Sequence, residues 1–227
     1  IAMVNRSNVK RFIYASSSSV YGVKEGVVDE SRSLEPLTDY SRFKMLCEKV
    51  LAEQASPDLC WTVIRPATVC GYAPRQRLDV IVNIFVTQAM ERGVLTVFGG
   101  DQFRPNIHVD DMVDAYLAVL FASADKVSRK TYNVGDLNHS VLTLAGMTKN
   151  VLASIREVEL QVQPTSDSRS YHVSSERIKE DISFIPRRGI EKAMRDLAVA
   201  IACGDLVDPA NNPLYSNIKT LQTKGIY

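Results

Sequence analysis

Residue types suited to proton chemistry lie close together near the start of this sequence. Tyr40 and Lys44 are four positions apart, and the serine run 16–19 precedes them. Positions i and i+4 share one face of a helix, so a phenol and an ammonium group at this spacing can act on one bound molecule. A neighbouring cation favours the phenolate form, and a serine hydroxyl can hydrogen-bond the alcohol or carbonyl being converted. The alternative interpretation is a buried tyrosine, a solvated lysine and a serine-rich turn.

The elements that must position these residues alternate between strands and helices. Short apolar runs predict strands near residues 9–15, 61–66, 94–98, 130–134 and 157–162. Helices are expected from Thr38 or Asp39 to about 51, over 78–92 up to Gly93, over 109–120, from Ser140 to 152, from Ser174 or Ser175, and over 190–203. This alternation predicts an α/β fold with a mostly parallel sheet. The serine run follows the first strand at its carboxyl end, where open α/β sheets bind ligands.

Apolar residues at helical spacing predict a buried stripe on two of these helices. The first stripe contains Phe43, Leu46, Cys47, Val50 and Leu51, and the second contains Val109, Met112, Val113, Tyr116, Leu117 and Leu120. Burial of the first stripe would leave Tyr40 and Lys44 near the face turned towards a ligand. Asp110 and Asp111 lie in a first helical turn, where negative charge is favourable, so a structural role is expected for both.

Four segments in order along the chain resemble one known family. They are residues 12–22 (Phe-Ile-Tyr-Ala-Ser-Ser-Ser-Ser-Val-Tyr-Gly), the Tyr-x-x-x-Lys of 40–44, residues 64–71 (Ile-Arg-Pro-Ala-Thr-Val-Cys-Gly) and residues 97–111. They are similar to motifs of the extended short-chain dehydrogenase/reductases that modify nucleotide sugars, the NAD-dependent epimerase/dehydratase group. The resemblance implies a Rossmann-like doubly wound parallel sheet, with its N-terminal strands missing, and a smaller C-terminal α/β substrate domain.

The resemblance also implies how the chain divides. Residues 1–71 and 104–135 would form the remaining part of the NAD-binding domain, and residues 72–103 and 136–210 the nucleotide-sugar domain. Residues 211–227 would form a C-terminal extension on the surface. A homodimer is expected, with the helices at 40–51 and 80–90 as its interface.

Catalytic roles follow from the same resemblance. Tyr40 would be the general base that takes the sugar hydroxyl proton, and Lys44 would support it and hydrogen-bond the nicotinamide ribose. Ser17 would stabilise the oxygen on the reacting carbon. The implied cofactor contacts are Ala15, Ser16, Tyr40, Lys44, Pro66 and Val69. NAD is the expected cofactor, and NADP remains open.

The implied partner is a nucleotide-diphosphate sugar. The implied substrate contacts are Ser18, Ser19, Thr68, Arg104 and Arg169. A guanidinium group can bind diphosphate oxygens in a bidentate manner, which suits Arg104 best, while a solvated role is equally open for Arg169. Thr68 stands where many members of the family carry asparagine.

Ser18 and Ser19 bear on which reaction is expected, because the 4,6-dehydratases of this family carry an Asp-Glu pair at these positions. Two hydroxyls cannot supply the acid and the base that elimination of water needs. Epimerisation through a 4-keto intermediate is therefore favoured over dehydration. A 4-dehydrogenase, reductase or dehydratase of the same fold and a non-catalytic sugar-nucleotide-binding protein remain alternatives, and the base, the sugar and the carbon stay open.

Composition excludes several other classes. The 27 basic and 26 acidic residues give a net charge of +1 without long blocks of one sign, so neither a nucleic-acid nor a membrane partner is indicated. The four cysteines and three histidines lack metal-ligand spacing, which predicts free thiols and no metal site. A cytoplasmic setting is the default expectation.

The sequence contains no Gly-x-x-Gly-x-x-Gly turn of the kind that holds a dinucleotide pyrophosphate. We therefore interpret the chain as a carboxyl-terminal piece of a longer enzyme. We expect the isolated 227 residues to be poorly soluble or inactive, because a parallel sheet cut through its middle exposes an apolar edge. The measurement is NAD-dependent turnover by the purified chain, and substantial turnover would refute this interpretation.

Overall fold

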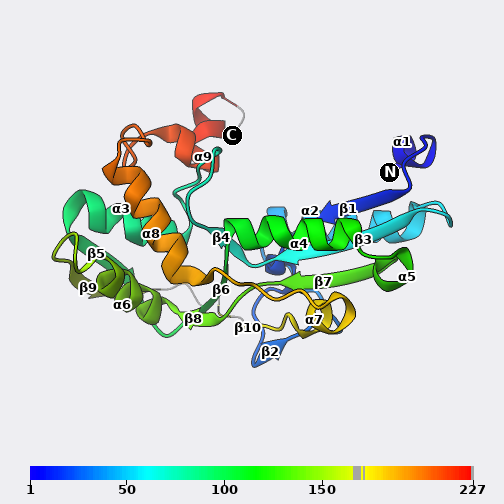
Figure 1. Ribbon diagram of the computed structural model, residues 1–227, viewed down its shortest axis with the longest axis horizontal. Helices are drawn as coiled ribbons and strands as arrows, with labels where there is room; N and C mark the ends of the chain where they lie inside the picture. Colours follow the sequence, from blue (N-terminus) through cyan, green and yellow to red (C-terminus); the bar gives the residue numbers. More distant parts are fainter. Residues whose placement is uncertain (166–169, 171, 226–227) are drawn as a thin grey trace.

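The computed structural model describes residues 1–165, 170 and 172–225, and it has two lobes that lie end to end (Figure 1). The first lobe is built on a parallel three-stranded sheet in the order β1-β3-β7. Its strands are β1 (Arg11–Ala15), β3 (Cys60–Pro66) and β7 (Lys130–Val134). Ala15 lies opposite Ile64, and Pro66 lies opposite Val134, so all three strands end at the same edge.

Helices cover both faces of this sheet. On one face, α2 (Asp39–Gln54) contributes Leu51 to a cluster with Trp61 and Val63. On the other face, α4 (Val109–Phe121) packs Met112, Ala115 and Val119 against a cluster that includes Ile64 and Tyr132. Because successive residues of a strand point to opposite faces, the alternation along β3 separates the two clusters. The predicted doubly wound α/β arrangement is confirmed for this part of the chain.

The second lobe has its own core. It is formed by the helices α3 (Ile81–Arg92), α6 (Val141–Leu152) and α8 (Gly189–Ala202) and by the parallel pair β5 (Val94–Phe98) and β9 (Glu159–Gln163). Where the two lobes meet, β6 (Phe103–His108) pairs in parallel with β4 (Thr68–Cys70) and antiparallel with β8 (Asn138–Ser140). None of the helices in the described ranges is long and apolar enough to cross a bilayer.

The remaining elements are short. They are α1 (Ala2–Asn5), η1 (Ser18–Tyr21), β2 (Val27–Val28), α5 (Ala124–Val127), β10 (His172–Val173), α7 (Glu176–Ile182), η2 (Pro213–Tyr215) and α9 (Asn217–Thr223). Local signals in the sequence place several of the longer helices correctly. Thr38 caps α2 through a reciprocal pair of hydrogen bonds with Ser41, and Ser140 caps α6. Gly93 ends α3 at φ +69°, a conformation that favours glycine.

The predicted buried stripe on α2 is wrong. Phe43 is 66% exposed, and Leu46, Cys47 and Val50 are exposed as well, so that only Leu51 of the stripe is buried. The residues that α2 turns towards the sheet include two polar ones, Ser41 and Glu48. The periodicity identified an apolar face correctly. It cannot tell which face of the helix meets the sheet when the sheet carries polar side chains that pair with polar residues of the helix.

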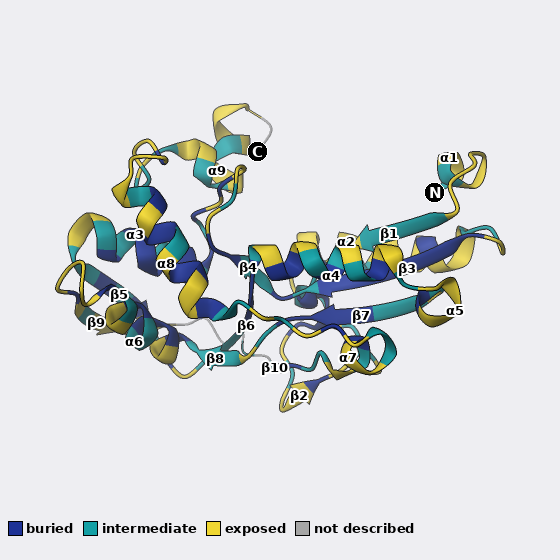
Figure 2. Ribbon diagram, in the orientation of Figure 1, coloured by how far each residue is buried: buried dark blue, intermediate teal, exposed yellow. Residues whose placement is uncertain are grey.

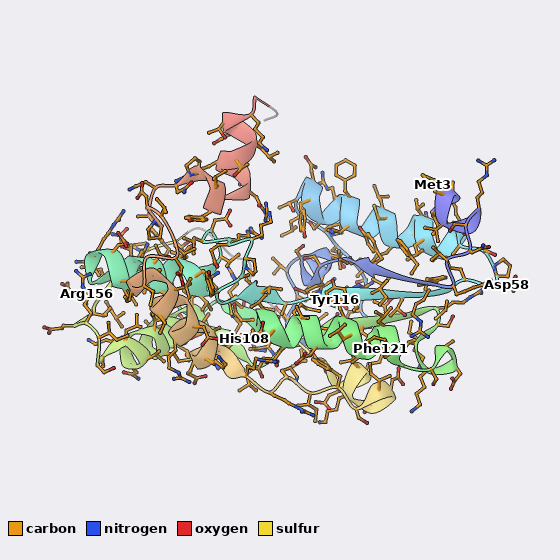
Figure 3. All side chains as sticks on the ribbon, turned by 45° about the horizontal axis from the view of Figure 1, so that its top comes forward. Met3, Asp58, His108, Tyr116, Phe121 and Arg156 are labelled. Atoms are coloured by element: carbon orange, nitrogen blue, oxygen red, sulfur yellow. The ribbon has the colours of Figure 1, made fainter. Side chains whose placement is uncertain are left out.

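The stripe on α4 is only partly buried. Met112 packs in the core, whereas Val113, Leu117 and Leu120 are exposed. Figure 2 shows exposed stretches along α4, and these three residues give that helix an apolar outer face. Phe121 ends this helix and is 80% exposed (Figure 3). In the described part of the chain, α2 and α4 therefore both leave apolar surface uncovered.

Two segments differ from the predicted division of the chain. Within 136–210, α7 packs against the first lobe, where Ile178 and Phe184 join the cluster around Ile64. The C-terminal tail is attached more firmly than a plain surface extension. Leu78 N donates to the carbonyl of Tyr215 at 2.8 Å, and Ser216 Oγ donates to Asp79 Oδ2 at 3.1 Å, so the tail holds the loop before α3.

A pair of phenylalanines tests the assignment of core and surface. Replacing Phe85, which is 1% exposed in the second core, with alanine should lower the free energy of unfolding by about 3–5 kcal/mol. The same substitution at exposed Phe121 should change it by less than about 0.5 kcal/mol. Urea unfolding followed by circular dichroism measures both values, and similar losses for the two variants would contradict this assignment.

Candidate active site

The carboxyl edge of the first sheet gathers the chain segments that the motifs singled out. Ala15 ends β1, and the backbone N–H of Ser16 donates to the carbonyl of Ile64 at 2.7 Å, which extends the pairing by one residue. Pro66 ends β3 beside Val134 of β7. The chain then enters β4 at Thr68, so this edge lies next to the sheet that joins the two lobes. Open α/β sheets bind their ligands at such an edge.

Lys44 connects α2 to this edge. Its Nζ donates a hydrogen bond of 2.6 Å to the carbonyl of Ala15. The same ammonium lies 5.6 Å from the ring centroid of Tyr40 and 5.3 Å from that of Tyr14, distances at which a cation is attracted to an aromatic face. Tyr40 is 59% exposed, so its phenol is not packed inside the protein and is accessible to a ligand.

The serine run forms a turn that packs against α2. Ser17 is the N-cap of η1, and its Oγ lies 2.8 Å from the Oγ of Ser19 and accepts a hydrogen bond from the Ser19 N–H. These two hydroxyls therefore lie together at the edge. Ser18 is 3% exposed, so its side chain is turned into the protein.

Ser16 contacts a buried ion pair, Glu48 with Arg65, that was not predicted from the sequence. Its buried hydroxyl donates to Oε1 of Glu48, which is also paired with Arg65 of β3. Arg65 Nη1 in turn donates to the hydroxyl of Tyr21 at 2.8 Å, and Tyr21 donates to Asn133 Oδ1 at 2.7 Å. Glu48 follows Lys44 by four positions, as Lys44 follows Tyr40, and that spacing was the signal that could have identified it.

Tyr21 follows the serine run, but it does not suit proton transfer. It is completely buried, and burial raises its pKa even though the neighbouring Arg65 opposes that effect. Both of its hydrogen bonds are made inside the protein. Of Tyr21 and Tyr40, Tyr40 is therefore the one that combines exposure with a neighbouring cation.

Several of the predicted ligand contacts beyond β1 lie on the β4-β6-β8 sheet, which joins the two lobes and is called the joining sheet below. Thr68 and Arg104 are half-buried on the adjacent strands β4 and β6, with Thr68 opposite Asn106. Arg104 Nη1 donates to the carbonyl of Phe103 at 3.0 Å. Val69 packs against the cluster around Ile64. Arg169 lies outside the described residues, so its prediction stays as it was.

Asp111 has the structural role that its position predicts. Its side chain is 2% exposed and accepts hydrogen bonds from the backbone N–H and Nη1 of Arg188, at 2.9 and 2.8 Å. Asp110 lies 3.6 Å from the same guanidinium group. His108 is buried where the lobes meet (Figure 3), and its Nδ1 accepts from the Asp110 N–H while its Nε2 lies 3.2 Å from Asp196 on α8. These contacts tie α4 to the segment that carries α8.

A parallel sheet with a Tyr-x-x-x-Lys helix over its first strand defines a Rossmann-like protein of the short-chain dehydrogenase/reductase type. The model of the NAD dependent epimerase/dehydratase family matches residues 1–135. Because this match covers more than half of the 227 residues, the chain belongs to that family.

Individual relatives agree with this assignment. The chain is 33% identical over 147 residues to an uncharacterised UDP-glucose epimerase, YtcB, of Bacillus subtilis, a match that covers 63% of this chain and 45% of YtcB. It is 28% identical over 209 residues to UDP-glucose 4-epimerase 2 of Arabidopsis thaliana, with 83% and 60% covered. The structure of MoeE5 in complex with UDP-glucuronic acid and NAD superposes with a TM-score of 0.76 at 26% identity, covering 89% of this chain and 68% of MoeE5. The chain thus spans about half the length of the curated relatives.

Buried Cys70 does not contribute a nucleophile to this edge. Cys70 ends β4, and burial raises the pKa of its thiol to about 12, which keeps it protonated at neutral pH. Cys47 and Cys203 are exposed, and Cys60 is buried. No three of the His, Cys, Asp and Glu residues that the structure describes are grouped so that they could hold a metal ion.

Thiol labelling tests this difference between the cysteines. At pH 8 the folded protein should react with iodoacetamide at Cys47 and Cys203, because both thiols are exposed to the reagent. Cys60 and Cys70 should react only after unfolding. Peptide mass spectrometry identifies the labelled positions, and rapid labelling of Cys70 in the folded protein would contradict its burial.

Proposed function

We propose that the protein containing this chain epimerises a nucleotide sugar at a ring hydroxyl, with NAD as cofactor. The observation that carries this proposal is the hydrogen bond from Lys44 to Ala15, which anchors an exposed Tyr40 beside the carboxyl edge of the sheet. The named activities of YtcB and the Arabidopsis relative, and the ligands in the MoeE5 complex, support the substrate class and the cofactor.

The residues at the edge fit the nicotinamide half of this cofactor. An ammonium group has three donors, and the bond to Ala15 uses one, so Lys44 can also bind ribose hydroxyls. Ala15, Ser16, Pro66 and Val69 supply backbone and small or apolar surface around the strand ends. NAD, when bound, accepts a hydride from the sugar carbon and returns it.

Tyr40 carries out the proton transfers. Its phenolate takes the hydroxyl proton as the carbon loses hydride, which leaves a keto sugar, and it returns the proton to the same oxygen after the sugar has turned its other face. Lys44, whose ammonium group lies 5.6 Å from the centre of the Tyr40 ring, places a positive charge beside the group that exchanges this proton. The hydroxyls of Ser17 and Ser19, which lie together, hydrogen-bond the reacting oxygen.

The rest of the substrate would lie along the joining sheet. We assign the diphosphate to Arg104, with Thr68 near the sugar and Arg169 as a second diphosphate ligand. Because Ser18 is buried, we assign the sugar contact of the serine run to Ser19 instead. With serines at both positions, no carboxyl pair is available there for elimination of water, and this favours epimerisation over dehydration.

We also propose a homodimer, with the outer face of α2 as its interface. Phe43, Leu46 and Val50 form an exposed apolar row along this helix, which is the kind of surface that subunit contacts bury. The second helix expected at the interface, α3, is already covered by the second core, where Val82, Phe85 and Val86 are buried. The exposed apolar face of α4 lies on the opposite side of the sheet, so we assign the interface to α2 alone.

The assay uses the chain preceded by the glycine-rich NAD-binding segment of its family, incubated with UDP-, GDP- and CDP-sugars. Formation of the epimer without net change in NADH is the expected result. A stoichiometric change in NADH would indicate a dehydrogenase or reductase instead, and binding without turnover would indicate a non-catalytic protein.

Substitution of Tyr40 tests its role directly. Tyr40→Phe should lower kcat by about 10²- to 10⁴-fold, because it removes the group that exchanges the proton and leaves the ring in place. Tyr215→Phe is the matched control, since Tyr215 lies in the C-terminal tail and its hydroxyl accepts a hydrogen bond from the Val207 N–H. Wild-type rates for Tyr40→Phe would remove Tyr40 from the mechanism.

A further inference from the structure

One stripe of α2 carries three residues, Tyr40, Lys44 and Glu48, at successive spacings of four. The first two have roles in the proposed function. Glu48 has none so far, although it is 8% exposed and carries a carboxylate in the layer between helix and sheet that also holds Leu51 and Trp61. A buried carboxylate is costly unless it is paired and hydrogen-bonded.

Glu48 is held by three donors, two from Arg65 of β3 and one from Ser16, the residue that follows β1. Its Oε1 accepts from Arg65 Nε at 3.0 Å and from the hydroxyl of Ser16, and its Oε2 accepts from Arg65 Nη2 at 2.6 Å. The two bonds to the guanidinium group are parallel and bidentate, so they fix direction as well as distance. Arg65 is 6% exposed and is itself fixed by its bond to Tyr21.

The two contacts of α2 with the end of β1 are consecutive. Lys44 bonds the carbonyl of Ala15, and one turn later Glu48 bonds the side chain of Ser16. Ser17 is the next residue, and its hydroxyl begins the turn that carries Ser19. A change at Glu48 would therefore affect both the rotation of α2 about its axis and the conformation of the serine turn.

We propose that Glu48 is a positioning residue, which sets Tyr40, Lys44 and the serine turn relative to one another through Ser16 and Arg65. This inference rests on the proposed function for its kinetic consequence. A role in stability alone explains the site less well, because a well-packed apolar side chain usually stabilises a buried position at least as much as an ion pair does. A carboxylate adds defined directions for three hydrogen bonds.

The test compares three variants of the protein used in the epimerase assay. Glu48→Gln keeps the volume but weakens the bidentate pair, and Ser16→Ala removes the link to the turn while leaving Glu48 and Arg65 paired. Glu53→Gln is the control, because Glu53 lies on the same helix and is exposed beside Lys49. Both test variants should lower kcat by about 10- to 100-fold, since a misplacement of about 1 Å can cost that much. KM for the nucleotide sugar should stay within about twofold, and Glu53→Gln should match the wild type.

A second readout is independent of turnover. In protein labelled with ζ-¹³C tyrosine, the Tyr40 resonance is identified by its absence from Tyr40→Phe. It should move in Glu48→Gln and Ser16→Ala, because the phenol changes its distance from the Lys44 charge, and it should not move in Glu53→Gln. If the wild type does not epimerise any sugar but this resonance follows Glu48, the proposed function fails and the positioning role stands.

The opposite results would overturn the inference. An unchanged Tyr40 resonance and unchanged kcat in folded Glu48→Gln would show that the carboxylate only fills space. If Glu48→Gln does not fold, Ser16→Ala tests the positioning role of Glu48 instead, because it leaves the buried ion pair of Glu48 and Arg65 intact. Wild-type kcat and an unmoved resonance in Ser16→Ala would then refute the role of Glu48.

Discussion

The hydrogen bond between the Lys44 ammonium group and the Ala15 carbonyl joins the helix that carries Tyr40 to the end of the first strand. The bonded residues are 29 positions apart in sequence, so the contact exists only when α2 lies across the sheet. A charged donor makes a stronger bond than a neutral one, and here it also keeps the cation beside the tyrosine ring. The accessible phenol, the serine turn and the strand ends all depend on this placement.

The second constraint is the junction between the lobes. His108 caps α4 and contacts Asp196 on α8, and Arg188 binds Asp111 from the segment that leads into α8. These buried or half-buried contacts hold the second lobe beside the carboxyl edge of the first sheet. A molecule that reaches from Tyr40 towards Arg104 would therefore meet residues from both lobes in a fixed arrangement.

Much of the fold could be predicted from the sequence because its signals are local. The strands over 94–98 and 130–134 were predicted with the observed bounds, and Thr38, Gly93 and Ser140 mark helix ends through their own chemistry. The spacing of Tyr40 and Lys44 places both on one stripe. That Lys44 meets Ala15 does not follow from spacing, because it depends on how the helix crosses the sheet.

The sequence by itself determined the order of strands and helices, the membership of the family through its motifs, and the residue types available for proton transfer. Tertiary structure decided which side of α2 meets the sheet. An apolar stripe predicts burial only if another surface covers it, and in the described chain Phe43 remains exposed while Glu48 is buried. The reason is that the partners of Glu48, Arg65 and Ser16, come from distant segments, so the most stable orientation of the helix could not be read from its own periodicity.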